Sequence, residues 1–206
     1  MKKETKRTIK KSIITCDSCV KKKCADDKDC FGITEQVLPK YSGVDLQLSR
    51  AASLIEGRYY MKKTRLEEII LFSHEMGFRK LGIAFCIGLA EEAKILCKFL
   101  RKEFEVHSVC CKACSIQKEI LDLEEIDPNK PESMCNPIGQ AMLLNQAETE
   151  LNLICGLCIG HDILFTKHSE APVSTFIVKD RLLAHNPVGA LYCRYLRKRL
   201  DSDEKQ

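Results

Sequence analysis

The chain after residue 43 alternates between two hydrophobic periods. Apolar residues recur at helical spacing in residues 45–57 and 64–77, and both stretches end at a glycine, a residue that commonly ends a helix. Residues 80–86 then form a short apolar run bounded by turn residues, which predicts a buried strand. A third helical pattern follows at residues 89–103.

The same alternation of strand and helix continues to the end of the chain. The further predicted strands are 104–111, 151–158 and 171–178, and the further predicted helices are 115–123, 137–150, 161–169 and 187–199. Apolar strands joined through helices are typical of a parallel sheet that is covered on both faces. We therefore predict a three-layer α/β domain with a mainly parallel sheet of about four strands.

The segment before this domain has a different composition. Residues 13–43 are polar and rich in cysteine, with little apolar material to form a core, and residues 1–12 contain six lysines or arginines and one glutamate. We expect a basic disordered tail over 1–12, a Cys-rich metal-binding segment over 13–43 and the α/β domain over 44–206.

Composition and charge narrow the possible classes of protein. The 45% hydrophobic and 30% charged residues are typical of a globular chain. No apolar run is long enough for a membrane span or a signal peptide, so we expect a cytoplasmic protein without a membrane partner. The tail contributes +5 to the net charge of +4, so the remaining chain has a net charge of −1. No basic stripe with interleaved aromatics follows the tail, so a nucleic-acid partner is not expected.

Thirteen cysteines are the most distinctive feature of the composition. In the cytoplasm thiols stay reduced, so this odd number favours metal or redox chemistry over a disulfide framework. A first group, Cys16, Cys19, Cys24 and Cys30, has the spacing C-x2-C-x4-C-x5-C. Four thiolates suit zinc or an iron-sulfur cluster, and a segment without a core needs such a centre to become ordered. Unligated thiols in a disordered segment are the alternative.

A second group of cysteines is scattered along the chain, three of them at the ends of predicted strands and one just before the predicted helix that begins at Pro137. These cysteines are Cys86, Cys111, Cys135 and Cys158. The carboxyl ends of parallel strands lie along one edge of a sheet, where α/β folds place their ligands. We therefore predict a second thiolate-rich pocket whose cysteines also bind metal. The alternative is that these cysteines are small buried hydrophobic residues, which is how we interpret Cys155 inside its strand.

Candidate catalytic residues follow the same strands. His161 and Asp162 come directly after Cys158, and Lys179, Asp180 and His185 come after the last predicted strand. Asp162 either orients the imidazole of His161 or caps the following helix. The alternative for Lys179 and Asp180, together with Arg181, is an ordinary solvated turn. The alternative for His185 is a helix entry over 185–187, with Asn186 as the N-cap of the last helix.

Several motifs of the chain together resemble a known family. The N-terminal cysteine cluster and the stretches IAFCIGL, VCCK, MCNPIGQA, GLCIGHD and VKDRLLAHNP resemble uncharacterised metal-binding proteins of bacteria and archaea, grouped only as a domain of unknown function. The resemblance covers nearly the whole chain after Thr15. It implies a Cys-rich metal-binding N-terminus on an α/β domain, without an established activity.

The chain departs from that family pattern at one position. The last N-terminal cysteine of the family lies in a Pro-x-x-Cys-Pro context, whereas the matching stretch LPKYSG has Ser42. Either Cys30 is the fourth ligand, or the site has three thiolates and an open position, which would suit a labile or catalytic metal.

Three hypotheses follow. The leading one is a metal-binding protein that holds zinc or an iron-sulfur cluster. The second is a thiol- or metal-dependent redox enzyme in which a strand-end cysteine is the nucleophile and His161 or His185 moves protons. The third is an interaction module that senses a small molecule. We expect a metal ion as the partner, with a small molecule or a protein redox partner as further possibilities. The sequence does not indicate the reaction or the oligomeric state.

Overall fold

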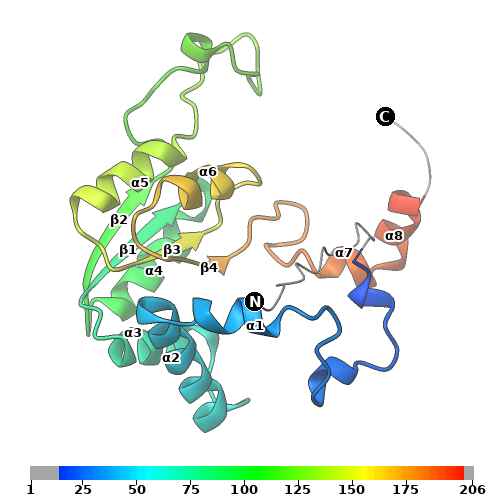
Figure 1. The fold of residues 1–206 in the computed structure, drawn as a ribbon. Helices are drawn as coiled ribbons and strands as arrows, with labels where there is room; N and C mark the ends of the chain where they lie inside the picture. The colour runs from blue at the N-terminus through cyan, green and yellow to red at the C-terminus, as the bar shows by residue number, and fades with distance from the viewer. Residues whose placement is uncertain (1–13, 202–206) are drawn as a thin grey trace, which may run out of the picture. The chain divides into compact units, whose positions relative to one another are not determined.

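A parallel sheet of four strands organises the α/β part of the chain (Figure 1). The computed structural model describes residues 14–201, and its strands lie in the order β2-β1-β3-β4. They are β1 Lys80–Phe85, β2 Glu105–Cys110, β3 Leu151–Cys155 and β4 Val173–Ile177. Every pair of neighbouring strands is parallel, which confirms the predicted fold class.

Helices cover both faces of this sheet. The helices that the structure describes are α1 Thr34–Val37, α2 Gly43–Tyr59, α3 Arg65–Glu75, α4 Ala90–Leu100, α5 Pro137–Gln146, α6 His161–His168, α7 Gly189–Tyr192 and α8 Arg194–Asp201. The connection from β1 to β2 through α4 and the connection from β2 to β3 through α5 run in opposite directions across the sheet. Because such connections are right-handed, α4 and α5 belong to opposite faces. Figure 1 shows this arrangement, with α6 beside α5.

Some predicted helix boundaries were wrong. The helix α2 continues through Gly57 to Tyr59 instead of ending at that glycine. The predicted helix at 115–123 is only a 3-10 turn, Lys118–Leu121. The predicted helix at 187–199 is divided into α7 and α8 at Cys193, whose backbone is extended.

The predicted strand 151–158 is also shorter than expected. It ends at Cys155 because Gly156 takes a φ of 71°, a left-handed conformation that turns the chain out of the sheet. A Cβ atom at Gly156 would lie 2.8 Å from the side chain of Leu89. Cys158 therefore does not end the strand, but lies in the turn before α6.

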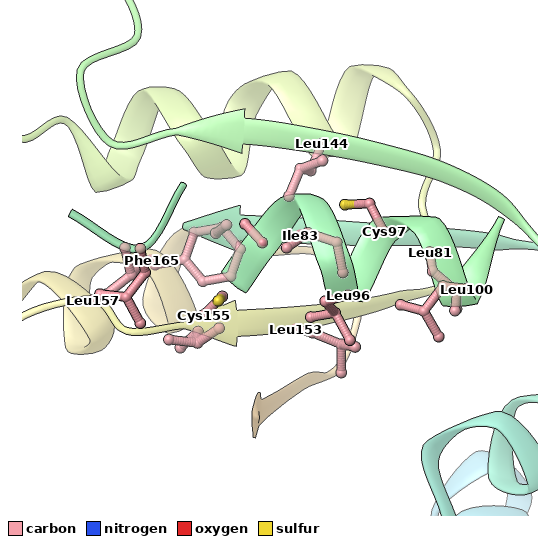
Figure 2. Close-up of a cluster of buried hydrophobic side chains, with 14 of the residues drawn as sticks. Leu81, Ile83, Leu96, Cys97, Leu100, Leu144, Leu153, Cys155, Leu157 and Phe165 are labelled. Carbon is pink, nitrogen blue, oxygen red and sulfur yellow. The ribbon is translucent and has the colours of Figure 1, made fainter. Parts of the chain in front are cut away.

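The core is formed by apolar side chains of the strands, α4, α5 and α6. Figure 2 shows part of it, including Ile83 of β1, Leu153 of β3 and Leu96 of α4. Cys155 and Cys97 are buried in this core, as predicted for Cys155. The core holds the strands rigidly, so the residues that follow each strand start from defined positions.

A buried asparagine constrains the neighbouring strand. The side chain of Asn152 in β3 accepts a hydrogen bond from Thr149 Oγ1 at 2.8 Å and donates one to Ser169 Oγ at 2.8 Å. A Cβ atom at Gly82 in β1 would lie 1.9 Å from Asn152 Oδ1. Glycine at this position lets the two strands pair without displacing the Asn152 side chain.

The strand order places a topological switch between β1 and β3. The chain leaves β1 toward β2 on one side and returns to β3 on the other side. Open α/β sheets bind their ligands outside the carboxyl ends of the strands at such a point. The residues to consider for a site are therefore those that follow β1, β2, β3 and β4.

The chain divides into two compact units between Ser53 and Leu54, inside α2. The predicted boundary at residue 43 stays a prediction, and the predicted tail over 1–12 lies outside the described residues. None of the helices in residues 14–201 is both long enough and apolar enough to cross a membrane.

Candidate thiol site

The ends of β1 and β2 bring two buried cysteines close together. Phe85 and Cys110 are partners in the sheet register, so Cys86 and Cys111 leave the two strands at the same level. The sulfur of Cys111 accepts a hydrogen bond from the backbone N–H of Ile87 at 3.3 Å. Cys86 is 6% exposed and Cys111 is 2% exposed, so bulk solvent reaches neither sulfur freely.

Cys135 joins Cys111 from a distant part of the chain. It precedes α5, which begins with Asn136 as N-cap, accepting from the N–H of Gly139 at 2.9 Å, and with Pro137 as the first helical residue. The N–H of Asn136 donates to the carbonyl of Cys111 at 2.7 Å. This backbone link leaves Cys135 Sγ 3.7 Å from Cys111 Sγ.

Contact between the two thiols shifts their pKa values in opposite directions. The hydrogen bond between the thiols of Cys135 and Cys111, followed by burial, raises the pKa of Cys111. The same bond, followed by a hydrogen bond with His161, lowers the pKa of Cys135. Cys135 also lies at the N-terminus of α5, where the helix dipole favours a thiolate. These opposite shifts favour a thiolate at Cys135 beside a neutral thiol at Cys111.

Two cations from the segment after β4 contact the other two cysteines. Lys179 Nζ lies 3.4 Å from Cys86 Sγ, and an Arg181 guanidinium nitrogen lies 3.0 Å from Cys158 Sγ. The contact with Cys158 raises the pKa of the Arg181 guanidinium. All four strand-end cysteines of the sequence prediction therefore interact with another thiol or with a cationic side chain.

A third cation lies next to Cys135. Lys112 directly follows Cys111, and its charge helps to lower the pKa of the Cys135 thiol. Its ammonium group donates to the carbonyl of Ser133 and lies 3.8 Å from a carboxylate oxygen of Glu132. Lys112 is thus partly neutralised, in contrast to the cations near Cys86 and Cys158.

The structure places the five predicted catalytic residues in different environments. His161 is the first residue of α6, and its interaction with Cys135 helps to lower the pKa of that thiol. Asp162 does not cap α6, which begins after Gly160, and within residues 14–201 it forms no hydrogen bond with His161. Its Oδ1 accepts from the N–H of Ile163 at 2.8 Å. Lys179 contacts Cys86, as described above.

Asp180 and His185 shape the loop that carries the cations. Asp180 Oδ1 accepts from the N–H groups of Leu182 at 3.0 Å and Leu183 at 2.9 Å. His185 Nδ1 accepts from the N–H of Asp180 at 3.1 Å, and the His185 N–H donates to the Asp180 carbonyl at 2.8 Å. These residues hold the turn closed. The prediction of Asn186 as a helix N-cap was wrong, because α7 begins after Val188.

Sequence reasoning did not identify three residues of the site: Lys112, Gln140 and Arg181. Gln140 is completely buried in α5, and its amide nitrogen donates to the carbonyls of Phe85 at 3.2 Å and Val109 at 2.7 Å. It thereby joins the carboxyl ends of β1 and β2, while its own Oε1 is buried without a hydrogen bond. Arg181 follows a strand and Lys112 follows a strand-end cysteine, so position alone could have indicated both.

The N-terminal cysteines have different surroundings. Cys16, Cys19, Cys24 and Cys30 are all exposed. Cys16 and Cys24 lie in two 3-10 turns, Cys16–Ser18 and Lys23–Ala25. Throughout residues 14–201, no group of three or more His, Cys, Asp or Glu side chains is placed so that it could hold a metal ion.

Comparisons with known proteins give a family but no activity. A family of proteins of unknown function, DUF1847, matches residues 24–176. The uncharacterized protein MJ0455 of Methanocaldococcus jannaschii is 54% identical over 187 residues, which cover 90% of this chain and 97% of that protein. No solved structure matches the chain.

Proposed function

The chain belongs to the DUF1847 family of unknown function, and we propose that it acts as a thiol–disulfide redox protein with Cys135 as the nucleophile and Cys111 as the resolving thiol. The observation that carries this proposal is the contact of 3.7 Å between the two sulfurs. A disulfide bond is about 2.05 Å long, so an approach of less than about 2 Å would join them.

The surroundings of the pair support this assignment of roles. Cys135 is half-buried, whereas Cys111 is buried, so an incoming disulfide meets Cys135 first. A hydrogen-bond donor on each side, the Cys111 thiol and the His161 imidazole, stabilises negative charge on its sulfur. A low-pKa thiol beside a second thiol is the usual arrangement for reversible thiol oxidation.

The chemistry is a two-step exchange with a small disulfide RSSR as the oxidant. The Cys135 thiolate attacks one sulfur of RSSR, forming a mixed disulfide and releasing RS⁻. Cys111 then loses its proton, attacks the Cys135 sulfur and displaces the second RS⁻, which takes up that proton. The dithiol loses two electrons, and RSSR gains them as RSH and RS⁻.

The test is the fate of the two cysteines when the reduced protein meets bis(2-hydroxyethyl) disulfide. We expect a peptide-mapped Cys111–Cys135 disulfide in the unaltered chain. Cys111→Ser should stop at the mixed disulfide on Cys135, and Cys135→Ser should not form it. Cys114→Ser, at an exposed neighbouring cysteine, is the matched control and should behave like the unaltered chain. Oxidation at other cysteines, with Cys111 and Cys135 still reduced, would refute the proposal.

A second function is supported by the N-terminal segment. Residues 14–42 contain no buried side chain, and their four cysteines are exposed. A segment with so little packing needs another source of order, and four thiolates could supply it by binding zinc or an iron-sulfur cluster. Binding would have to draw these thiols together, and Cys30 would then be the ligand expected in place of Ser42.

Elemental analysis of anaerobically purified protein tests this second function. We expect about one zinc or one iron-sulfur cluster per chain, lost when Cys16 and Cys19 are both changed to Ser. The matched control changes Cys110 and Cys114 to Ser and should keep the metal. Visible absorption distinguishes the cluster from colourless zinc. Metal-free protein with an unchanged circular dichroism spectrum would contradict the assignment.

A further inference from the structure

The charges around the thiols indicate which disulfides the site would accept. Resting on the proposed dithiol function, we propose that the substrate is an anionic low-molecular-weight disulfide whose acidic groups are bound by Lys179 and Arg181. Both side chains extend from one short segment after β4 toward sulfur atoms that follow two other strands. The charge of Cys135 also contributes to the raised pKa of Arg181, so this cation lies near enough to the attacking sulfur to bind the non-reacting part of a substrate.

These two cations have no acidic partner in the part of the chain that the structure describes. No salt bridge there involves Lys179 or Arg181, whereas the nearby Lys112 lies 3.8 Å from Glu132. Lys179 is partly buried, and a cation removed from water without a counter-ion is costly. An anionic ligand would supply the missing charge.

The acidic residues of the same segments are engaged elsewhere. Asp180 accepts two backbone hydrogen bonds in its own loop, and Asp162 accepts one from Ile163. Glu132, near Lys112, is paired with Lys118 at 2.8 Å. Lys179 and Arg181 therefore contact sulfur atoms and no carboxylate in the described residues. A cationic disulfide would therefore be repelled from the sulfur that attacks it, whereas an anionic disulfide would be attracted.

The reaction steps remain those of the dithiol exchange. The Cys135 thiolate displaces one anionic thiolate from the disulfide, and Cys111 displaces the second while giving its proton to it. Both products are anionic thiols. The cations help by holding the negative groups of the substrate while two negatively charged partners, the thiolate and the disulfide, approach each other.

Three disulfides of similar reactivity but different charge test the inference. They are glutathione disulfide, which is anionic, bis(2-hydroxyethyl) disulfide, which is neutral, and cystamine, which is cationic. We expect the second-order rate constant for Cys135 at low ionic strength to be at least about tenfold larger for the anionic than for the cationic probe. Added salt should reduce this ratio.

Charge-removing variants locate the effect. Lys179→Gln and Arg181→Gln should each lower the ratio of anionic to neutral rate constants several-fold. That ratio cancels any general change in the nucleophilicity of Cys135. Lys167→Gln removes the same charge from an exposed position on α6 and should leave the ratio unchanged. Equal ratios in all variants would overturn the inference.

The two proposals fail in different ways. If the neutral disulfide oxidises Cys135 and Cys111 but the three probes react at the same rate, the redox function stands and the anionic substrate is wrong. If no probe oxidises this pair, the redox function itself is wrong and the charge preference falls with it.

Discussion

Single cysteines of this chain acquire different chemistry from their surroundings. Cys155 is completely buried at the end of β3, and burial raises the pKa of its thiol to about 12, so it behaves as a small core residue. Cys135 is only half-buried and faces hydrogen-bond donors, which lower its pKa. Sequence position alone places both residues near a strand or helix end.

The pH dependence of alkylation should distinguish Cys135 from the other thiols. Its pKa is lowered by the Cys111 thiol, then by His161, with Lys112 adding a smaller effect. Its thiolate therefore persists as the pH falls below about 8.5, where an ordinary thiol is protonated, and is lost only when the pH falls through the lowered pKa. We expect iodoacetamide to modify Cys135 preferentially at pH 6, measured by peptide mass spectrometry.

Removing a donor should shift this profile. His161→Ala should raise the pKa of Cys135, because the thiolate loses a hydrogen bond, so alkylation at pH 6 should slow. The control is His168→Ala, at the other end of the same helix α6. If Cys135 and the exposed Cys114 lost reactivity at the same pH in the unaltered chain, the thiolate assignment would be wrong.

At the level of elements, the pairing of β1 with β3 depends on a glycine. Gly82 faces Asn152 and Leu144 of α5, and the Asn152 side chain is held in place by Thr149 and Ser169. It cannot easily move away from an added methyl group. Cys86 follows β1, and Cys158 lies in the turn after β3. A change in the pairing of these two strands would therefore displace residues of the candidate site.

Two glycine variants should therefore have opposite effects on stability. Gly82→Ala should lower the free energy of unfolding by about 1–3 kcal/mol, because this is the usual cost of adding a methyl group to a close-packed core. Gly57→Ala, in α2 with no atom near the added Cβ, should raise it by about 0.5–1 kcal/mol through backbone entropy. Urea unfolding followed by circular dichroism measures both. An unchanged midpoint for Gly82→Ala would show that Asn152 can relax.

The candidate site exists only in the whole α/β part of the molecule. Cys86, Cys111, Cys135 and Cys158 come from four separate segments, and the cations come from a fifth segment after β4. The sheet order gathers these segments at one edge, on either side of the switch between β1 and β3. Gln140 joins the ends of β1 and β2 at the same edge, so the fold and the site depend on the same contacts.

Much of this arrangement could be predicted, but not its contacts. The placement of Cys86 and Cys111 after parallel strands followed from the hydrophobic pattern, and the structure confirms it; the pairing of these two strands with each other did not follow from the pattern. The roles of Asp162 and His185 did not follow, because local hydrogen bonds to backbone groups compete for such side chains. The helix at 115–123 was overpredicted since helical spacing of apolar residues does not ensure that a helix finds a surface to pack on.

The sequence by itself determined the α/β class, the parallel sheet and the position of cysteines after its strands, because hydrophobic period and the alternation of strand with helix are local properties of the chain. Only the tertiary structure decided that Cys111 contacts Cys135, and that Lys179 and Arg181 reach the sulfurs of Cys86 and Cys158. The physical reason is that strand order and loop conformation depend on packing between residues far apart in sequence, which no local pattern records.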